Sequence, residues 1–181
     1  AENGSADADT DGGHDTSTTV LADDLSTDAY LGDYTLASDD HASTVTVTLT
    51  DTERLLEGNG LPNHDTGEFP NAGNPNSISE QAVSASFPLE PVHTGEAEPV
   101  KEPGLSIAGV LFDPQTAETA TCSNGTTYRI EALQDVVDLG LDTNNAHVQP
   151  TGAYHYHGVS SDLVDAADTG DVGRQAEEVG G

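Results

Sequence analysis

Strict alternation of apolar and polar residues marks the clearest predicted element, a β-strand over residues 43–50. Val45, Val47 and Leu49 share one face of this strand and threonines fill the other, because successive strand side chains point to opposite sides. The threonine face meets either solvent or another subunit. This strand ends a longer stretch typical of β structure, residues 19–50, and two further stretches have the same character, residues 82–90 and 104–112.

Glycine, proline and asparagine separate these strands. Residues 56–80 are rich in all three and predict a long loop with several turns, which in a folded domain is usually functional or irregular. Asn124-Gly125 predicts a β-hairpin. Apolar residues at helical spacing over 129–137 predict one short helix that ends near Gly140. The predicted fold class is therefore mainly β, as a sandwich or irregular barrel, with one short helix and long loops.

The two ends of the chain differ from its middle. Residues 1–18 are small and acidic and lack large apolar groups, which predicts a flexible tail. Residues 161–181 have the same character, and we expect this acidic segment to continue in another chain or in a further segment of the precursor. The β domain is assigned to residues 19–160.

Charge narrows the range of partners. The chain carries 33 acidic and 4 basic residues, for a formal net charge of −29. Nucleic acid and anionic membranes repel such a surface, and no run reaches the roughly 18 apolar residues of a membrane-spanning helix. The acids are spread along the whole chain, which favours adaptation to high salt, since molar salt shortens the Debye length to about 3 Å. Paired carboxylates leave Ca²⁺ binding open, although no EF-hand spacing occurs.

Cysteine and asparagine suggest two modifications. Cys122 is the single cysteine, so a disulfide would have to join it to another chain or segment, and the alternative is a free thiol. Asn124 and Asn3 each begin a triplet that fits the N-glycosylation acceptor pattern. That pattern has meaning only outside the cytoplasm, so both expectations depend on an extracellular location.

The candidate chemistry lies in "AHVQPTGAYHYHG", residues 146–158. Pro150-Thr151-Gly152 predicts a turn between two short strands. If these three residues form the loop, His147 lies opposite His155, and a slip of one residue would move His147 to the other side. The pattern then places His147, His155 and His157 on one face of the ribbon and Tyr154 and Tyr156 on the other.

Three imidazoles on one face can bind one transition-metal ion, with Zn or Cu the best match to nitrogen ligands. His64 in the long loop is the candidate fourth ligand, and Glu118 or Asp142 offers a carboxylate instead. Tyr154 and Tyr156 are expected to pack behind the ligands. The alternative is that these histidines are hydrogen-bonded core or surface residues without a metal. The remaining histidines lie in polar segments and are expected to be solvated: His14, His41 and His93.

The segment "YHYH" at residues 154–157 resembles the signature of the YHYH domain, and "GLDTNNAHVQPTGAYHYHG" resembles that family's motif block. "NGLPNHDTGEFPNAGNPNSISEQ" and "GVLFDPQTAET" resemble its upstream blocks, so that the resemblance covers residues 45–160. It implies an extracellular protein of the kind found in bacteria and haloarchaea, with metal bound by histidines. Related domains continue past this block, which implies that the chain covers the N-terminal part and that another segment completes the fold.

Three functions remain open on the sequence. The first is an extracellular metal-binding domain. The second is a structural subunit of a cell-surface filament or homo-oligomer, completed by a partner chain or strand. The third is a metal-dependent hydrolase or oxidoreductase with Asp142 or Glu118 as base, although no motif specifies a reaction and catalytic residues remain unknown.

Overall fold

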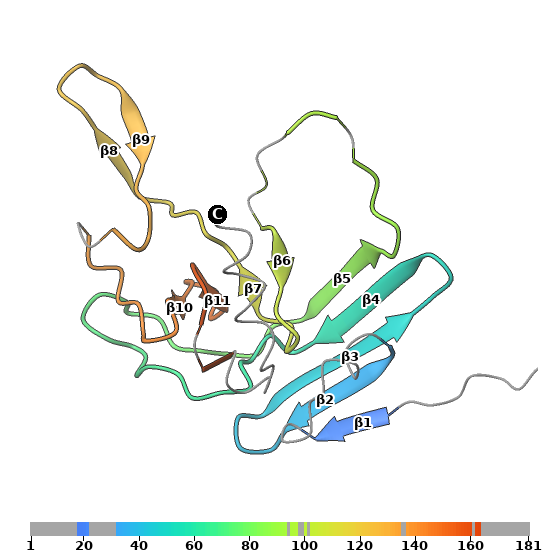
Figure 1. The fold of residues 1–181 in the computed structure, drawn as a ribbon. Coiled ribbons are helices and arrows are strands. Elements are labelled where there is room, and N and C mark those ends of the chain that lie inside the picture. Colours follow the sequence, from blue (N-terminus) through green and yellow to red (C-terminus); the bar gives the residue numbers. More distant parts are fainter. Residues whose placement is uncertain are drawn as a thin grey trace, which may run out of the picture.

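The computed structural model describes residues 18–21 by their main chain, and residues 32–93, 95–97, 100, 102–134, 137–160 and 162–163 with side chains. Strands dominate this part of the chain, which confirms the predicted mainly β class (Figure 1). Their bounds are β1 Thr18–Leu21, β2 Tyr34–Ser38, β3 Ser43–Leu49, β4 Glu53–Gly58, β5 Val83–Pro88, β6 Gly104–Leu105, β7 Leu111–Phe112, β8 Thr119–Thr121, β9 Thr127–Arg129, β10 Ala146–Val148 and β11 Tyr154–Tyr156.

The largest sheet follows the chain in the order β1-β2-β3-β4-β5. β1 runs parallel to β2, and all other neighbours are antiparallel. On its inner face Val45 pairs with Leu36, and Val47 lies opposite both Tyr34 and Leu56. These five side chains are buried, whereas the alternate threonines of β3 are exposed, as the alternation predicts. Burying a Val or Leu side chain stabilises a fold by about 1.5–3 kcal/mol, so this face supplies one hydrophobic core.

The second sheet, in the order β10-β11-β7-β6, carries the histidine ribbon. β11 is parallel to β7 and antiparallel to β10. Its core contains Val110, Val148, Tyr154 and Tyr156. The predicted loop over 56–80 begins only at residue 59, because residues 56–58 belong to β4, and the segment 59–82 contains no strand and runs beside β10 and β11 (Figure 1). Three side-chain and main-chain contacts hold the loop there: the Asn74 and Asn76 amides donate to the Val148 carbonyl, and the Ser79 N–H donates to the Gly152 carbonyl.

The predicted strand over 104–112 is instead two short strands, β6 and β7, joined by a turn. Gly109 has a φ of +77°, which a glycine adopts without a steric penalty, and its N–H donates to the Ser106 carbonyl. The chain therefore reverses direction here, and Ala108 at the turn packs into the core of the first sheet.

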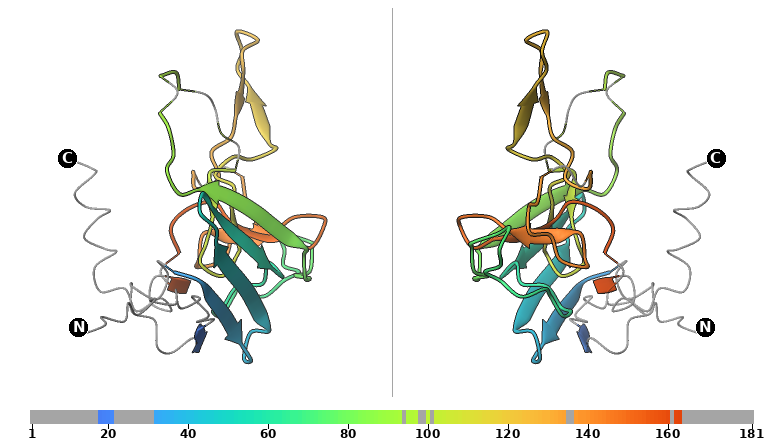
Figure 2. Two further views of the ribbon diagram at one scale, coloured as in Figure 1. Left: turned by 90° about the vertical axis from the view of Figure 1, so that its right-hand side faces the viewer. Right: turned by 90° about the vertical axis from the view of Figure 1, so that its left-hand side faces the viewer.

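The strands β8 and β9 form a separate hairpin that projects away from the two larger sheets (Figures 1 and 2). Its turn lies at Asn124-Gly125, as predicted, where the Cys122 N–H donates to the Thr126 carbonyl at 2.9 Å. Gly125 has a φ of +83°. All residues of both strands are exposed, so the hairpin is held by its ladder and its base and contributes nothing to either core.

The predicted helix over 129–137 is wrong in the described part of that segment. Arg129 ends β9, and residues 131–134 form turns. The Ile130 N–H donates to the Glu118 carbonyl at 3.0 Å, and the Ile130 carbonyl accepts from the Thr116 hydroxyl. Both main-chain groups of Ile130 are thus used across the hairpin base, which withdraws them from the i to i−4 pattern of a helix.

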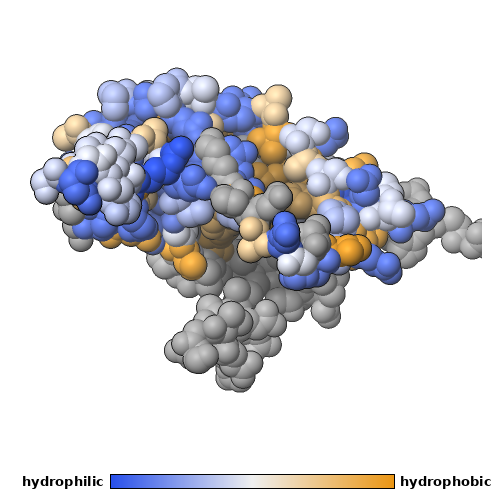
Figure 3. Space-filling model, turned by 90° about the horizontal axis from the view of Figure 1, so that it is seen from above, coloured by the Kyte–Doolittle hydropathy of each residue, from blue (hydrophilic) through white to orange (hydrophobic). Residues whose placement is uncertain are grey.

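Hydrophilic side chains cover most of the surface seen from above the hairpin, with a smaller apolar area near the centre (Figure 3). No helix among the described residues is long and apolar enough to cross a membrane. The acidic segments expected at 1–18 and 161–181 lie outside the described residues, apart from Thr18 and residues 162–163, and the Asn3 triplet lies outside them as well.

The core of the first sheet generates a stability prediction. Leu36 is fully buried, so we expect Leu36→Ala to lower the free energy of unfolding by about 2–5 kcal/mol through lost contacts and the cavity left behind. Denaturant titration followed by circular dichroism measures the change. Val92→Ala is the matched control, because Val92 is 85% exposed, and equal stability of the two variants would contradict this core assignment.

Candidate metal centre

The register of the β10–β11 ribbon is the one predicted from the turn. His147 lies opposite His155, and Val148 lies opposite Tyr154. The Gln149 N–H donates to the Ala153 carbonyl at 2.9 Å, and Gly152 closes the turn with a φ of +88°. A Cβ at Gly152 would lie 2.0 Å from the hydroxyl oxygen of Ser79, so both the main-chain conformation and the neighbouring loop require glycine.

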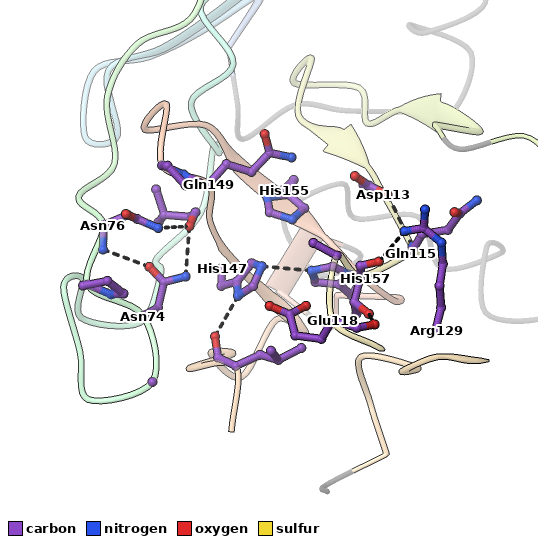
Figure 4. Close-up of a pocket in the computed structure, with 17 residues that line it drawn as sticks. Asn74, Asn76, Asp113, Gln115, Glu118, Arg129, His147, Gln149, His155 and His157 are labelled. Carbon is purple, nitrogen blue, oxygen red and sulfur yellow. Dashed lines mark hydrogen bonds between the residues drawn. The ribbon is translucent and has the colours of Figure 1, made fainter. Parts of the chain in front are cut away.

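This register brings the three histidines of the ribbon together, as predicted (Figure 4). The ligand atoms of His147, His155 and His157 lie within 4.8 Å of one another. The Nε2 atoms of His147 and His157 are 3.1 Å apart. Two nitrogens bound tetrahedrally to Zn²⁺ at 2.0–2.1 Å would be separated by about 3.3 Å, so this pair needs only a small adjustment to share an ion.

Main-chain carbonyls orient two of the three rings. The Nδ1 atom of His147 lies 2.7 Å from the carbonyl of Leu139, and Nδ1 of His155 lies 3.3 Å from the carbonyl of Ala153. A carbonyl oxygen only accepts, so each Nδ1 carries the proton and each Nε2 keeps its lone pair. Metal-binding histidines typically have this arrangement, in which the second ring nitrogen donates to a carbonyl or carboxylate.

The surroundings keep two of the three imidazoles, those of His155 and His157, uncharged. His155 and His157 are only 2% and 6% exposed. Burial lowers the pKa of His155 to about 4, assisted by the neighbouring charges that His157 and His147 would carry. Burial and His147 likewise lower the pKa of His157 to about 4. Because a metal binds the neutral ring, the two buried histidines are in their ligand form at neutral pH.

A cavity of about 510 Å³ opens beside the histidine cluster. Loop segment 73–76, the strand β10 and the base of the β8–β9 hairpin border it. Besides the three histidines, its polar and charged lining includes Asn74, Asn76, Asp113, Gln115, Thr116, Glu118, Arg129 and Gln149. The predicted carboxylate Glu118 therefore lies in the pocket of the cluster, whereas the only grouping of metal-ligand type among the described residues is the histidine trio itself.

His64 does not join this cluster, so its predicted role as fourth ligand is corrected. It lies on the tyrosine side of the ribbon, and its Nε2 is 2.6 Å from the Tyr156 hydroxyl. Its Nδ1 is 2.7 Å from the Asp65 carbonyl and must carry the proton, so Nε2 accepts from Tyr156. Burial raises the pKa of Tyr156, which keeps its hydroxyl protonated as the donor. His64 is thus a structural partner of Tyr156.

Asp142 is also on the tyrosine side. Its carboxylate accepts four hydrogen bonds, from the Tyr154 hydroxyl at 2.7 Å and from the main-chain N–H groups of Gly67, Asn144 and Ala146. Burial and the bond to Asp142 raise the pKa of Tyr154. These bonds join Asp142 to the ribbon, to Asn144 and to loop residue 67, so Asp142 fastens the loop and lies outside the histidine grouping. Tyr154 and Tyr156 pack behind the histidines as predicted, as core residues.

The two predicted modification sites lie on the projecting hairpin. Cys122 is an exposed free cysteine, and Asn124 is exposed in the turn, where its side-chain oxygen accepts from the Thr126 N–H at 3.0 Å. Both residues are accessible to another chain or to a modifying enzyme. The disulfide and the glycan remain predictions.

Fold and site define a β protein with a two-sided ribbon, histidines on one side and hydrogen-bonded tyrosines on the other. A family model described as "YHYH protein" matches residues 84–179, more than half of the chain. The chain belongs to this family, which confirms the resemblance. The matched region includes the hairpin, the ribbon and the pocket's Arg129 but begins after the long loop. Neither the curated proteins nor the solved structures contain a match.

Sequence reasoning missed the residues that complete the site from outside the ribbon. The Leu139 carbonyl orients His147, and Arg129, Gln115 and Gln149 line the pocket. Every residue has a main-chain carbonyl, so the residue type at position 139 gives no sign that its carbonyl orients a histidine. The only signal for Arg129 was its rarity, as one of 4 basic residues in the chain.

Removing the Tyr156 hydroxyl tests the tyrosine side of the ribbon. We expect Tyr156→Phe to lower the free energy of unfolding by about 1–3 kcal/mol, because it leaves the buried Nε2 of His64 without its donor. Urea titration measures this loss. Tyr128→Phe serves as control, because Tyr128 is 58% exposed. Unchanged stability of Tyr156→Phe would contradict the hydrogen bond.

The lowered pKa values of His155 and His157 predict acid sensitivity of the metal-free protein. Both groups bind a proton more readily in the unfolded chain, where the pKa is near 6.5, than in the folded one, where it is about 4. Their contribution to stability is therefore present above pH 6.5 and is lost as pH falls to 4. Melting temperatures with chelator present should decline across this window, and a flat profile would contradict the assignment.

Proposed function

We propose that this YHYH protein is an extracellular domain that binds one transition-metal ion through the Nε2 atoms of His147, His155 and His157. The observation that carries the proposal is the orientation of the rings. Two Nδ1 atoms donate to main-chain carbonyls, and three ligand nitrogens gather within 4.8 Å. A packing role alone does not call for three nitrogens directed at one point, since each ring would be stabilised better by a separate partner.

The ligand set selects among metals. Three imidazole nitrogens suit Zn²⁺ or Cu²⁺, whereas Ca²⁺ takes oxygen ligands at longer distance. The Ca²⁺ interpretation left open by the acidic composition therefore has no support at this cluster. The neutral state of the buried rings favours binding at neutral pH, because no proton has to be displaced from them.

Two observations support a location outside the cell. The chain belongs to a family for which the sequence resemblance implied an extracellular location. Its net charge of −29 also suits a protein exposed to high external salt. The same charge argues against nucleic acid as a partner. The proposal does not require a second chain that completes the domain, because all three proposed ligands lie within residues 147–157 of this chain.

A second candidate function is a metal-dependent hydrolase or oxidoreductase. The specific observation in its favour is the cavity of about 510 Å³ beside the cluster. Three protein ligands leave a further position at a zinc ion, and catalytic zinc sites use that position for water or substrate. Glu118 in the same pocket is the predicted carboxylate that supports a role as base, whereas Asp142 bonds to Tyr154 on the other side of the ribbon.

Metal content tests the proposal. Protein purified at high salt and then equilibrated with Zn²⁺ or Cu²⁺ should retain about one ion per chain by elemental mass spectrometry. His155→Ala should reduce retention by at least tenfold, because loss of a ligand removes a third of the site. His93→Ala is the matched control, since His93 is exposed and outside the pocket.

Circular dichroism of both variants separates loss of a ligand from loss of the fold. Wild-type protein without stoichiometric metal would overturn the proposal and leave "YHYH" as a packing motif. Full retention by a folded His155→Ala variant would do the same. Turnover of a hydrolysable or reducible probe that is abolished by chelator would favour the enzyme over simple binding.

A further inference from the structure

Arg129 is the unusual residue of the pocket. The chain holds 33 acidic and 4 basic residues, yet no Asp or Glu oxygen of the described residues lies within 4 Å of the Arg129 guanidinium. Its Nη1 instead donates to the main-chain carbonyl of Thr116 at 2.7 Å. In so acidic a chain a carboxylate partner is easily supplied. The guanidinium is therefore held in place by a neutral acceptor and keeps its charge available.

The position of Arg129 links it to the histidine cluster. It ends strand β9, and both it and Thr116 border the same cavity as His147, His155 and His157. In Figure 4, His157 lies between His147 and the side of the pocket from which Arg129 comes. A pocket of about 510 Å³ falls in the range of small-molecule sites. A molecule bound in this cavity can therefore meet both the ligand nitrogens and a fixed cation.

We infer that the pocket binds a small organic carboxylate, with its carboxylate on Arg129 and a second donor group directed to the metal. This inference rests on the proposed metal function and names the class of ligand for that site. Arginine binds a carboxylate through two parallel hydrogen bonds, and four of its five N–H groups remain after the bond to Thr116. The neutral amide of Gln115 lines the same pocket and offers further hydrogen bonds.

Charge favours a carboxylate over a phosphate. The chain carries a charge of −29, and the exposed carboxylate of Glu118 lies in the same pocket. A phosphate group brings up to two negative charges and a carboxylate one, so repulsion by Glu118 and by Asp113, the second carboxylate of the lining, discriminates against the phosphate. At molar salt the long-range repulsion is screened within about 3 Å, and the local contact with Arg129 then decides binding.

A ligand series of constant size provides the test. Succinate, succinamate and succinamide differ only in replacing carboxylates by amides and carry charges of −2, −1 and 0. Isothermal titration calorimetry of the zinc-loaded chain at fixed potassium chloride should show succinamate binding at least about tenfold more tightly than succinamide, the effect of one charged hydrogen-bonded pair. Arg129→Gln should abolish this preference while retaining one zinc ion per chain.

Two further variants complete the design. Arg54→Gln removes the same charge on β4, outside the pocket, and should keep the preference for succinamate. Glu118→Gln removes a like charge from the pocket and should strengthen succinamate binding severalfold. If Glu118→Gln instead loses zinc, Glu118 is a metal ligand and the charge argument fails.

The outcomes separate this inference from the proposed function. Zinc stoichiometry is measured first, and its absence in wild type overturns both. Zinc bound with equal affinity for succinamate and succinamide overturns the carboxylate site alone. A preference for succinamate over succinamide that survives in Arg129→Gln also overturns the carboxylate site. Inorganic phosphate that binds more tightly than succinate overturns the ligand class and leaves Arg129 as an anion-binding residue.

Discussion

The pairing of His147 with His155 is the constraint on which the rest of the site depends. The side-chain period of a strand is two, so a slip of one residue would exchange the two faces of a strand. The three-residue turn fixes this register, and Ser79 on the long loop leaves no space for any residue but glycine at 152. One local pairing thus decides that three imidazoles meet, that two tyrosines are buried, and that loop residues 64–67 pack against the tyrosine side.

The two faces of the ribbon satisfy their polar groups in different ways. On the tyrosine side every hydroxyl has a protein partner, with Tyr156 donating to His64 and Tyr154 donating to Asp142. On the histidine side the Nδ1 atoms of His147 and His155 are satisfied by carbonyls, while Nε2 of His147 faces Nε2 of His157 and the ring of His155 contacts both other imidazoles. The first arrangement is complete without a ligand. The second concentrates acceptor nitrogens at one point, which is the chemistry that a transition metal stabilises.

The charges of the acidic surface and the charges of the pocket act over different distances. The net charge of −29 governs how the whole molecule behaves in salt, and it is distributed along the chain. The pocket is governed by a few groups at short range: the three imidazoles, the carboxylates Asp113 and Glu118, and Arg129. Salt screens the long-range interactions of the net charge far more than the short-range interactions in the pocket, because contacts within a partly enclosed cavity are shielded from salt. A strongly acidic protein can therefore still present a fixed cation, Arg129, within a pocket that also contains carboxylates.

The sequence by itself determined the mainly β class, the strand at 43–50, the hairpin turn at Asn124-Gly125 and the faces of the ribbon, because each depends on alternation or turn chemistry within about a dozen residues. It also determined the family, through its long motif. Only the tertiary structure decided that His64 accepts a hydrogen bond from Tyr156 and that Asp142 fastens the loop. It also decided that the main chain of Ile130 bonds across the base of a hairpin and does not form a helix. These outcomes depend on partners up to 92 residues away, and no local pattern encodes which buried group will satisfy which.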